Sequence, residues 1–289
     1  MNKFFTILFP AAAAMVIQGC ANYDMAGMLH VQSPEVNSRF EESMNFNKAD
    51  GARTINCTTD SYKVYVGTDM HIDTKATTAH TDRFLTDFRE DENEGFAIIL
   101  GDLVNTNENI PKASARVREM AGEKEGKVFF TLGNHDVYFG QWKDWSKEWG
   151  TSTYTLEVST GTAKDLFICL DSADGLLGTR QLAWFKETLK NAKGYRHTFV
   201  FTHTHPFKKD GSQGHTSNYP MEETYELTGL LGEAGVDMFL CGHDHAREVT
   251  HFNGVEYIIV DALEEHYGNA AYMILNVGES LSYKFIGID

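Results

Sequence analysis

The sequence is poor in positive charge and in cysteine. Its 289 residues hold 25 Lys and Arg against 41 Asp and Glu, which gives a formal net charge of −16. This balance argues against a nuclease, because duplex nucleic acid usually demands a broad basic surface. Only 4 cysteines are present, and no Cys-x-x-Cys pair exists to suggest structural zinc. A small domain built on disulfides is excluded as well.

The sequence also has no internal repeat and no low-complexity linker. Its 42% of apolar and 23% of charged residues are ordinary for a globular protein and exclude disorder and collagen-like structure. The length allows one large domain or two modest ones. If such an acidic protein handles phosphate, the positive charge has to be local, and bound metal is the obvious source.

Residues 1–20 have the three-part pattern of a secretory signal peptide. Lys3 precedes an apolar run from Phe4 to Ile17, which is too short to span a membrane comfortably. The ending IQGC resembles a bacterial lipobox, in which Cys20 is lipidated and becomes the first residue of the mature chain. We therefore expect an exported protein that is held to a bacterial membrane by its lipid alone and faces the periplasm or the cell surface. The alternative is a plain secretory signal in which Cys20 is incidental.

The chain after the signal divides into two parts. Residues 21–57 are weakly periodic and are expected to form a tether that packs partly on the body, with a short amphipathic helix around Ser38–Asn47. Residues 58–289 are expected to form one catalytic domain.

The domain alternates between two kinds of segment. Short β-rich runs are YKVYVGT, FAIIL, KVFFTL, LFICLD, HTFVFTH and VDMFLC, and helical stretches such as TDRFLTDFRED and TRQLAWFKETLKN lie between them. This alternation predicts an α/β fold with a largely buried sheet covered by helices. An Asn253-Gly254 hairpin turn and two later strands add antiparallel pairs near the C-terminus.

Polar residues follow the apolar runs at five places. In chain order these are DMH at 69–71, GD at 101–102, GNHD at 133–136, THTHP at 202–206 and GHDH at 242–245. Ligands bind at the carboxyl ends of strands in open α/β sheets, so five such ends can converge on one site. Asp, His and Asn are donors to divalent metals, and their number suits two ions. Each motif alone is explained by a cap or a turn; five in order indicate a site.

The series DMH, GDLVN, GNHD, FTHTHP and GHDH resembles the calcineurin-like metallophosphoesterase superfamily from Asp69 to His245. The resemblance implies a four-layer αββα sandwich with mixed sheets. It also implies a two-metal hydrolase of phosphate esters, in which a hydroxide bridging the metals attacks phosphorus. The phosphodiesterase type is favoured; the alternatives are a phosphomonoesterase of the same fold and a non-catalytic, metal-containing binding lipoprotein.

The resemblance also assigns roles to residues. It implies one metal held by Asp69, His71 and His245, a second held by Asn134, His203 and His243, and a bridge between them made by Asp102. His135 would stabilise developing charge and protonate the leaving group, and Asp136 would orient His135. Within FTHTHP the alternative is that His205 binds metal and His203 packs.

Two departures from purple acid phosphatases narrow the choice of metal. Those enzymes carry a tyrosine ligand three residues after the bridging Asp, where this chain has Asn105, and they tend to have Glu where it has Asp136. A tyrosinate–iron(III) centre is therefore not expected. We expect two divalent ions of Mn, Fe or Zn, between which the ligand set does not choose.

Evidence on the substrate is thinner. His205, Lys208 and His215 are candidates for contacting it, against the alternative that residues 208–223 are a solvated loop. Glu264, Glu265 and His266 follow a later strand and are candidates for the mouth of the site. The expected substrate is a small phosphate ester or a phosphorylated component of the cell envelope, and no nucleic acid.

Overall fold

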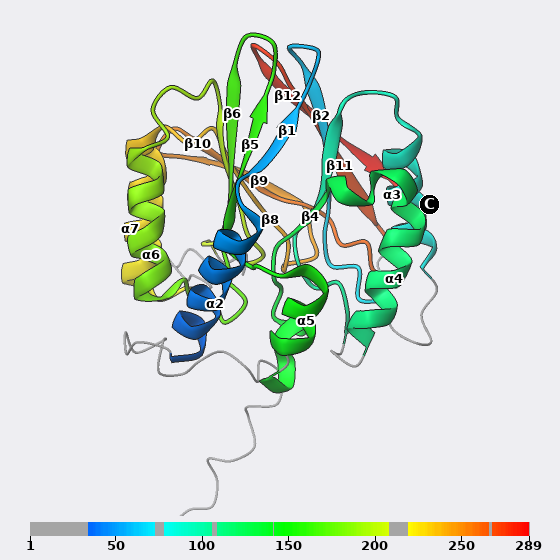
Figure 1. Cartoon of the computed structure of the whole chain (residues 1–289), viewed down its shortest axis with the longest axis horizontal. Helices are drawn as coiled ribbons and strands as arrows, with labels where there is room; N and C mark the ends of the chain where they lie inside the picture. The colour runs from blue at the N-terminus through cyan, green and yellow to red at the C-terminus, as the bar shows by residue number, and fades with distance from the viewer. Residues whose placement is uncertain are drawn as a thin grey trace, which may run out of the picture.

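Two β-sheets packed face to face, with helices on both outer faces, make up the fold (Figure 1). The computed structural model describes residues 34–72, 78–105, 109–140, 142–207, 219–265 and 268–288. The predicted signal peptide with Cys20, together with Lys208, His215 and His266, lies outside these residues. Among the residues that are described, no helix combines the length and the apolar character that crossing a membrane requires.

The larger sheet has the strand order β1-β5-β6-β7-β8-β10-β9. Its strands are β1 (Arg53–Asn56), β5 (Tyr154–Ser159), β6 (Lys164–Cys169), β7 (Thr198–Phe201), β8 (Met238–Cys241), β9 (Glu248–Phe252) and β10 (Val255–Ile259). The pairs β5–β6 and β9–β10 are antiparallel and the others are parallel. Asn253 and Gly254 join β9 to β10 with positive φ at both residues, as the predicted hairpin turn requires.

The smaller sheet has the order β12-β11-β2-β3-β4. Its strands are β2 (Tyr62–Gly67), β3 (Gly95–Ile99), β4 (Val128–Phe130), β11 (Ala271–Val277) and β12 (Leu281–Gly287). Strands β2, β3 and β4 are parallel neighbours, whereas β11 runs antiparallel to β2 and β12. Both sheets are thus mixed, and antiparallel strands are added near the C-terminus as predicted.

Helices complete the four layers. Helices α3 (Ala79–Glu90), α4 (Ile110–Ala121) and α5 (Trp142–Trp149) share a core with the smaller sheet, and α6 (Gly178–Lys190) and α7 (Met221–Ala234) share one with the larger sheet. The 3₁₀ helices η2 (Gly122–Lys127) and η3 (His135–Gly140) lie in the connections. A third core, with side chains such as Val64, Phe96 and Phe167, fills the space between the sheets. The predicted αββα sandwich is confirmed.

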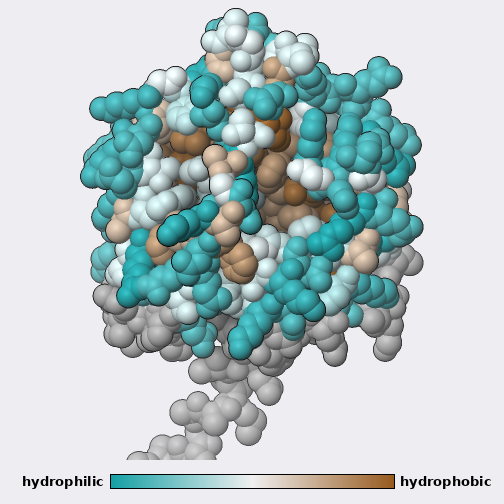
Figure 2. Space-filling model, in the orientation of Figure 1, coloured by the Kyte–Doolittle hydropathy of each residue, from teal (hydrophilic) through white to brown (hydrophobic). Residues whose placement is uncertain are grey.

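Figure 2 shows hydrophilic side chains over most of one face, with hydrophobic residues gathered in its middle, where Figure 1 places β1, β5 and β4. Phe129 of β4 is partly buried and packs against the core between the sheets.

Residues 34–57 are more structured than the predicted tether. Helix α2 (Pro34–Asp50) exceeds the expected helix of residues 38–47 at both ends and packs beside α6. Strand β1 follows and pairs with β5 at the edge of the larger sheet. Neither β1 nor β5 was predicted, although β5 alternates between buried and half-buried residues in the manner of a strand.

A buried ion cluster fixes α2 to the domain. The Nε of Arg39 lies 2.9 Å from Oδ2 of Asp171, and its Nη1 lies 2.9 Å from Oδ2 of Asp174. Ser152 also donates a hydrogen bond to Asp171, at 2.9 Å. Because all these side chains are buried, water could not take the place of the guanidinium beside either carboxylate.

Removing this guanidinium should destabilise the whole domain. We expect Arg39→Ala to lower the free energy of unfolding by about 3–5 kcal/mol, because Asp171 and Asp174 stay buried without their cation. The matched control is Arg83→Ala, since Arg83 pairs with Asp87 on the surface and exposed pairs contribute about 1 kcal/mol or less. Urea unfolding measures both; equal losses would show that α2 is not held by this cluster.

Candidate metal centre

The polar motifs follow strands that are neighbours in their sheets. Asp69 and His71 follow β2, Asp102 follows β3, Asn134 and His135 follow β4, His203 follows β7, and His243 and His245 follow β8. Strands β2, β3 and β4 are parallel and adjacent, as are β7 and β8. Parallel neighbours end at the same edge, so the two sheets bring these side chains to one place.

The loops that carry the site have an unusual backbone. Among the described residues, the non-glycine residues with positive φ are Asp69, His71, Asp102, His243, His245 and the hairpin residue Asn253. Left-handed backbone at such residues costs on the order of 1–3 kcal/mol each and persists where the surroundings impose it. Its concentration here marks the functional site.

Glycines allow these loops to lie against one another. A Cβ on Gly133 would collide with the backbone and carboxylate of Asp102, and one on Gly242 would collide with Thr68. The glycines that begin GNHD and GHDH are therefore needed for close approach of backbone to the site.

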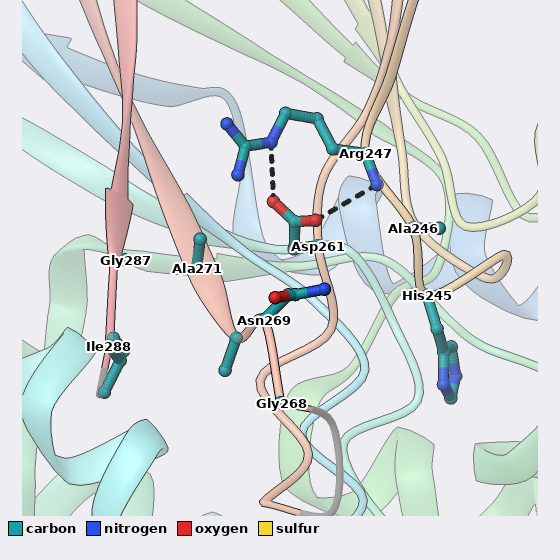
Figure 3. A pocket seen from close by; sticks show the side chains of 10 residues that line it. His245, Ala246, Arg247, Asp261, Gly268, Asn269, Ala271, Gly287 and Ile288 are labelled. Carbon is teal, nitrogen blue, oxygen red and sulfur yellow. Dashed lines mark hydrogen bonds and ion pairs between the residues drawn. The ribbon is translucent and has the colours of Figure 1, made fainter.

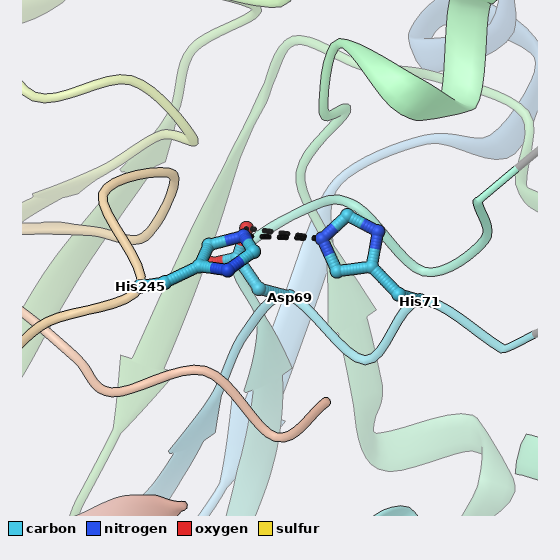
Figure 4. A group of neighbouring side chains, drawn as sticks. All are labelled: Asp69, His71 and His245. Carbon is cyan, nitrogen blue, oxygen red and sulfur yellow. Dashed lines mark hydrogen bonds and ion pairs between the residues drawn. The ribbon is translucent and has the colours of Figure 1, made fainter. Parts of the chain in front are cut away.

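Asp69, His71 and His245 form the first cluster (Figure 4). The Nε2 atom of His245 lies 3.2 Å from Oδ1 of Asp69 and 3.1 Å from Nε2 of His71. The other carboxylate oxygen, Oδ2, accepts hydrogen bonds from Thr68 Oγ1 at 2.7 Å and from the His243 amide at 2.9 Å. Oδ1 is buried and accepts no hydrogen bond from the described residues. A carboxylate oxygen and two facing imidazole nitrogens suit a cation between them.

The second cluster contains His203, His243 and Asn134. Nε2 of His203 and Nδ1 of His243 lie 3.2 Å apart, and each is 3.0 Å from Oδ1 of Asn134. Nδ1 of His203 is 2.7 Å from the Leu100 carbonyl oxygen. A ring nitrogen that donates to this carbonyl leaves Nε2 directed at the cluster, as in histidines that bind metals.

Asp102 lies between the two clusters. Its Oδ2 is 3.3 Å from Nε2 of His203 and 3.8 Å from Nε2 of His71, while Oδ1 accepts the His135 amide at 2.8 Å. The candidate ligand atoms of Asp102, His203 and His243 lie within 4.8 Å of one another, as do those of the first cluster. One carboxylate thus faces both clusters.

The electrostatics of the site favour a cation. Burial opposes a charged ring at His203, yet the carboxylates of Asp102 and Asp69 raise its pKa to about 10. Burial and the neighbouring His203 lower the pKa of His243 to about 4. The carboxylates therefore retain a proton on His203, and a divalent cation would displace it. The buried oxygen and nitrogen donors fit a dimetal centre without thiolate.

Asp136 does not orient His135, which corrects the role predicted from the sequence. Its Oδ1 accepts the backbone N–H of Leu103 at 3.0 Å and of Val104 at 3.3 Å, and its Oδ2 accepts that of Gly133 at 2.9 Å. Burial and the charge on Asp102 raise the pKa of Asp136, whereas the backbone N–H groups of Gly133 and Val104 favour the carboxylate and lower it. The side chain holds the loops after β3 and β4 together.

His135 has different neighbours from those predicted. Its Nδ1 lies 3.1 Å from the carbonyl oxygen of Asn105. Its ring is 4.7 Å from the His71 ring and 4.5 Å from the Tyr138 ring, centre to centre. Tyr138 was missed in the sequence, although residues three apart share a face of a 3₁₀ helix.

His205 lies away from the two clusters. Its ring is buried against Phe207 and Tyr257, and its Nδ1 is 2.7 Å from the Phe207 carbonyl oxygen. Among the described residues, His203 belongs to a candidate metal-binding group, whereas His205 belongs to none and its side chain is buried. Glu264, a candidate for the mouth, has Oε2 3.9 Å from Nδ1 of His245.

A cavity of about 640 Å³ lies beside His245. Figure 3 shows the Arg247–Asp261 pair above Asn269, with His245 on the same segment as Arg247. Asp261 accepts the Arg247 amide at 3.1 Å and its Nε at 2.8 Å, and the guanidinium lies 4.1 Å from the centre of the Phe285 ring. In the part of the chain that is described, its two terminal nitrogens make no hydrogen bond.

The calcineurin-like phosphoesterase family matches residues 62–247. Solved structures of similar fold include GAP50, the anchor in the inner membrane complex of Plasmodium (TM-score 0.60, 16% identity, 79% of this chain and 85% of that one). A dimetal phosphatase from Danio rerio has a TM-score of 0.57 and 15% identity, over 78% of this chain and 96% of that one. A purple acid phosphatase from seeds of yellow lupin, Lupinus luteus, has a TM-score of 0.55 and 14% identity, over 78% of this chain and 52% of that one. At these identities the likeness shows the fold alone. No curated protein sequence matches the chain.

The role of Asp136 in joining the two loops can be tested by mutation. We expect Asp136→Asn to lower the free energy of unfolding by about 1–3 kcal/mol, because an amide nitrogen would face buried backbone N–H groups. His135→Asn, the matched control on the neighbouring residue, should stay within about 1 kcal/mol of the parent. Urea unfolding of the metal-free protein decides it. If Asp136→Asn retained full stability, the side chain would not be holding the two loops together.

Proposed function

The chain belongs to the calcineurin-like phosphoesterase family and is a metal-dependent phosphoesterase, and we propose that it hydrolyses phosphodiesters at two divalent ions. The observation that carries this proposal is the position of Asp102 between two clusters of donors. One carboxylate shared by two clusters of donors would suit a pair of neighbouring divalent ions.

We assign the ligands as follows: Asp69, His71 and His245 hold one ion, Asn134, His203 and His243 hold the other, and Asp102 contacts both. When bound, the ions neutralise phosphate charge and lower the pKa of the attacking water. The donor set suits Mn, Fe or Zn.

His135 is proposed to serve the leaving group. If its Nδ1 donates to the Asn105 carbonyl, its Nε2 remains to exchange a proton with the departing alcohol. The ring is partly exposed and lies beside His71, so a phosphate at the ions would come within its reach.

Room for a second organic group supports the diester. A phosphodiester carries two such groups, and the cavity beside His245 accommodates one of them next to the proposed ions. The guanidinium of Arg247, held in place by Asp261, would donate to oxygen atoms of that group. A phosphomonoester carries only one such group. The proposed substrate is a small phosphodiester or a phosphorylated component of the envelope.

The activity test compares two model esters. We expect the full-length protein, purified in detergent and loaded with Mn²⁺, to hydrolyse bis-p-nitrophenyl phosphate faster than p-nitrophenyl phosphate, measured as released nitrophenolate. Asp102→Asn should lose metal-dependent turnover, because the shared ligand is weakened. His135→Asn should lower kcat by about 10²–10⁴-fold, the contribution of a positioned acid.

The possible results separate the candidate functions. Faster release from the monoester would favour a phosphomonoesterase. Equal rates for the parent and Asp102→Asn would contradict catalysis at these two clusters. A parent that hydrolyses neither ester would favour a binding lipoprotein.

We also propose that the protein is exported and held to a membrane by lipid on Cys20, on the basis of the IQGC sequence after the apolar run. Expressed in a bacterium, the full chain should sediment with membranes, and Cys20→Ser should shift it to the soluble or the unprocessed fraction, measured by immunoblot. The matched control is Cys57→Ser, which should leave the distribution unchanged. Loss of membrane association in both variants, or in neither, would contradict a lipid anchor on Cys20.

A further inference from the structure

Tyr138 contacts both an assigned metal ligand and the assigned acid of this site. Its hydroxyl accepts a hydrogen bond from Nδ2 of Asn134 at 2.7 Å, and its ring lies 4.5 Å from the His135 ring at 48°. Asn134 is an assigned ligand and His135 is the assigned acid. We propose that Tyr138 is a positioning residue that orients the Asn134 amide for one metal ion; this inference rests on the proposed function.

The local backbone explains why this residue reaches both neighbours. Helix η3 begins at His135, and in a 3₁₀ helix residues i and i+3 are eclipsed. Tyr138 is three residues after His135, so the two rings lie on one side of the helix. Asn134 immediately precedes the helix, which brings its side chain within reach of the Tyr138 hydroxyl.

The hydrogen bond to the Tyr138 hydroxyl holds the Asn134 amide in one position. An amide side chain has a carbonyl oxygen and an NH₂ group of similar shape, and its hydrogen bonds decide which way each faces. Because Nδ2 is directed to Tyr138, Oδ1 faces His203 and His243, at 3.0 Å from each. Turned the other way, the amide would present N–H bonds to the cation, and N–H cannot ligate it.

Contacts of this kind change the metal affinity of other proteins. Partners that orient the ligands of a metal typically change its affinity by about 10–100-fold when they are removed. The Tyr138 hydroxyl is hydrogen-bonded to Asn134, which is assigned to one ion, so the effect should fall on that ion.

The test is Tyr138→Phe, which removes the hydroxyl and keeps the ring. In full-length protein purified in detergent, we expect equilibrium dialysis with Mn²⁺ to show one ion bound about 10–100-fold more weakly and the other unchanged. Raising Mn²⁺ should restore kcat with KM unchanged. The control is Tyr283→Phe, which removes a hydrogen bond of 2.9 Å to Glu256 on another part of the surface and should leave both affinities unchanged.

A second variant, Tyr138→Leu, also removes the ring. At saturating Mn²⁺ its kcat should stay below that of Tyr138→Phe, because His135 loses its packing partner. If Tyr138→Phe bound two ions with the parent's affinities, or if only its KM changed, the inference would be wrong. A parent that bound fewer than two ions would instead overturn the proposed function, so the two failures are distinguishable.

Discussion

The carboxylate of Asp102 is the group around which the site is arranged. It follows β3, which lies between β2 and β4 in the smaller sheet, so the loops carrying Asp69 and Asn134 lie on either side of it. Backbone hydrogen bonds join the Asp69 loop to the Asp102 loop, from the His71 amide to the Asp102 carbonyl for example. The histidines after β7 and β8 approach from the larger sheet. A bridging ligand must face both ions, and the central strand is where the topology allows this.

Holding so many polar groups in the interior requires support from the backbone conformation and from further hydrogen bonds. Left-handed backbone at five site residues, and glycines at Gly133 and Gly242 that admit neighbouring loops, give the side chains their directions. Asp136 then ties two of these loops through backbone N–H groups. The strain is concentrated where chemistry requires it, and buried packing in three cores offsets its cost.

Much of the fold follows from local pattern. The apolar runs that became β2, β3, β6, β7 and β8 are short and rich in β-forming residues, and their lengths exclude helices. The hairpin at Asn253-Gly254 follows from turn chemistry alone. Strands β1 and β5 were not predicted, because RTIN is too short for a periodic signal and the alternation in β5 is carried by only three buried residues. The full length of helix α2 was not predicted, because its contacts with the domain depend on Arg39. This charged residue can be buried only because carboxylates distant in sequence pair with it.

By itself the sequence determined the types of donor, their order and their place after strands, since these depend on residue chemistry and local periodicity. Only the tertiary structure decided which groups meet. His203 and His205 are two residues apart and would face one way in an extended chain, so nothing local separates them, whereas the fold directs one to Asn134 and packs the other on Phe207. Asp136 likewise binds the amide of Leu103, a residue from another loop. Such pairings depend on the approach of segments distant in sequence, and no local pattern contains that information.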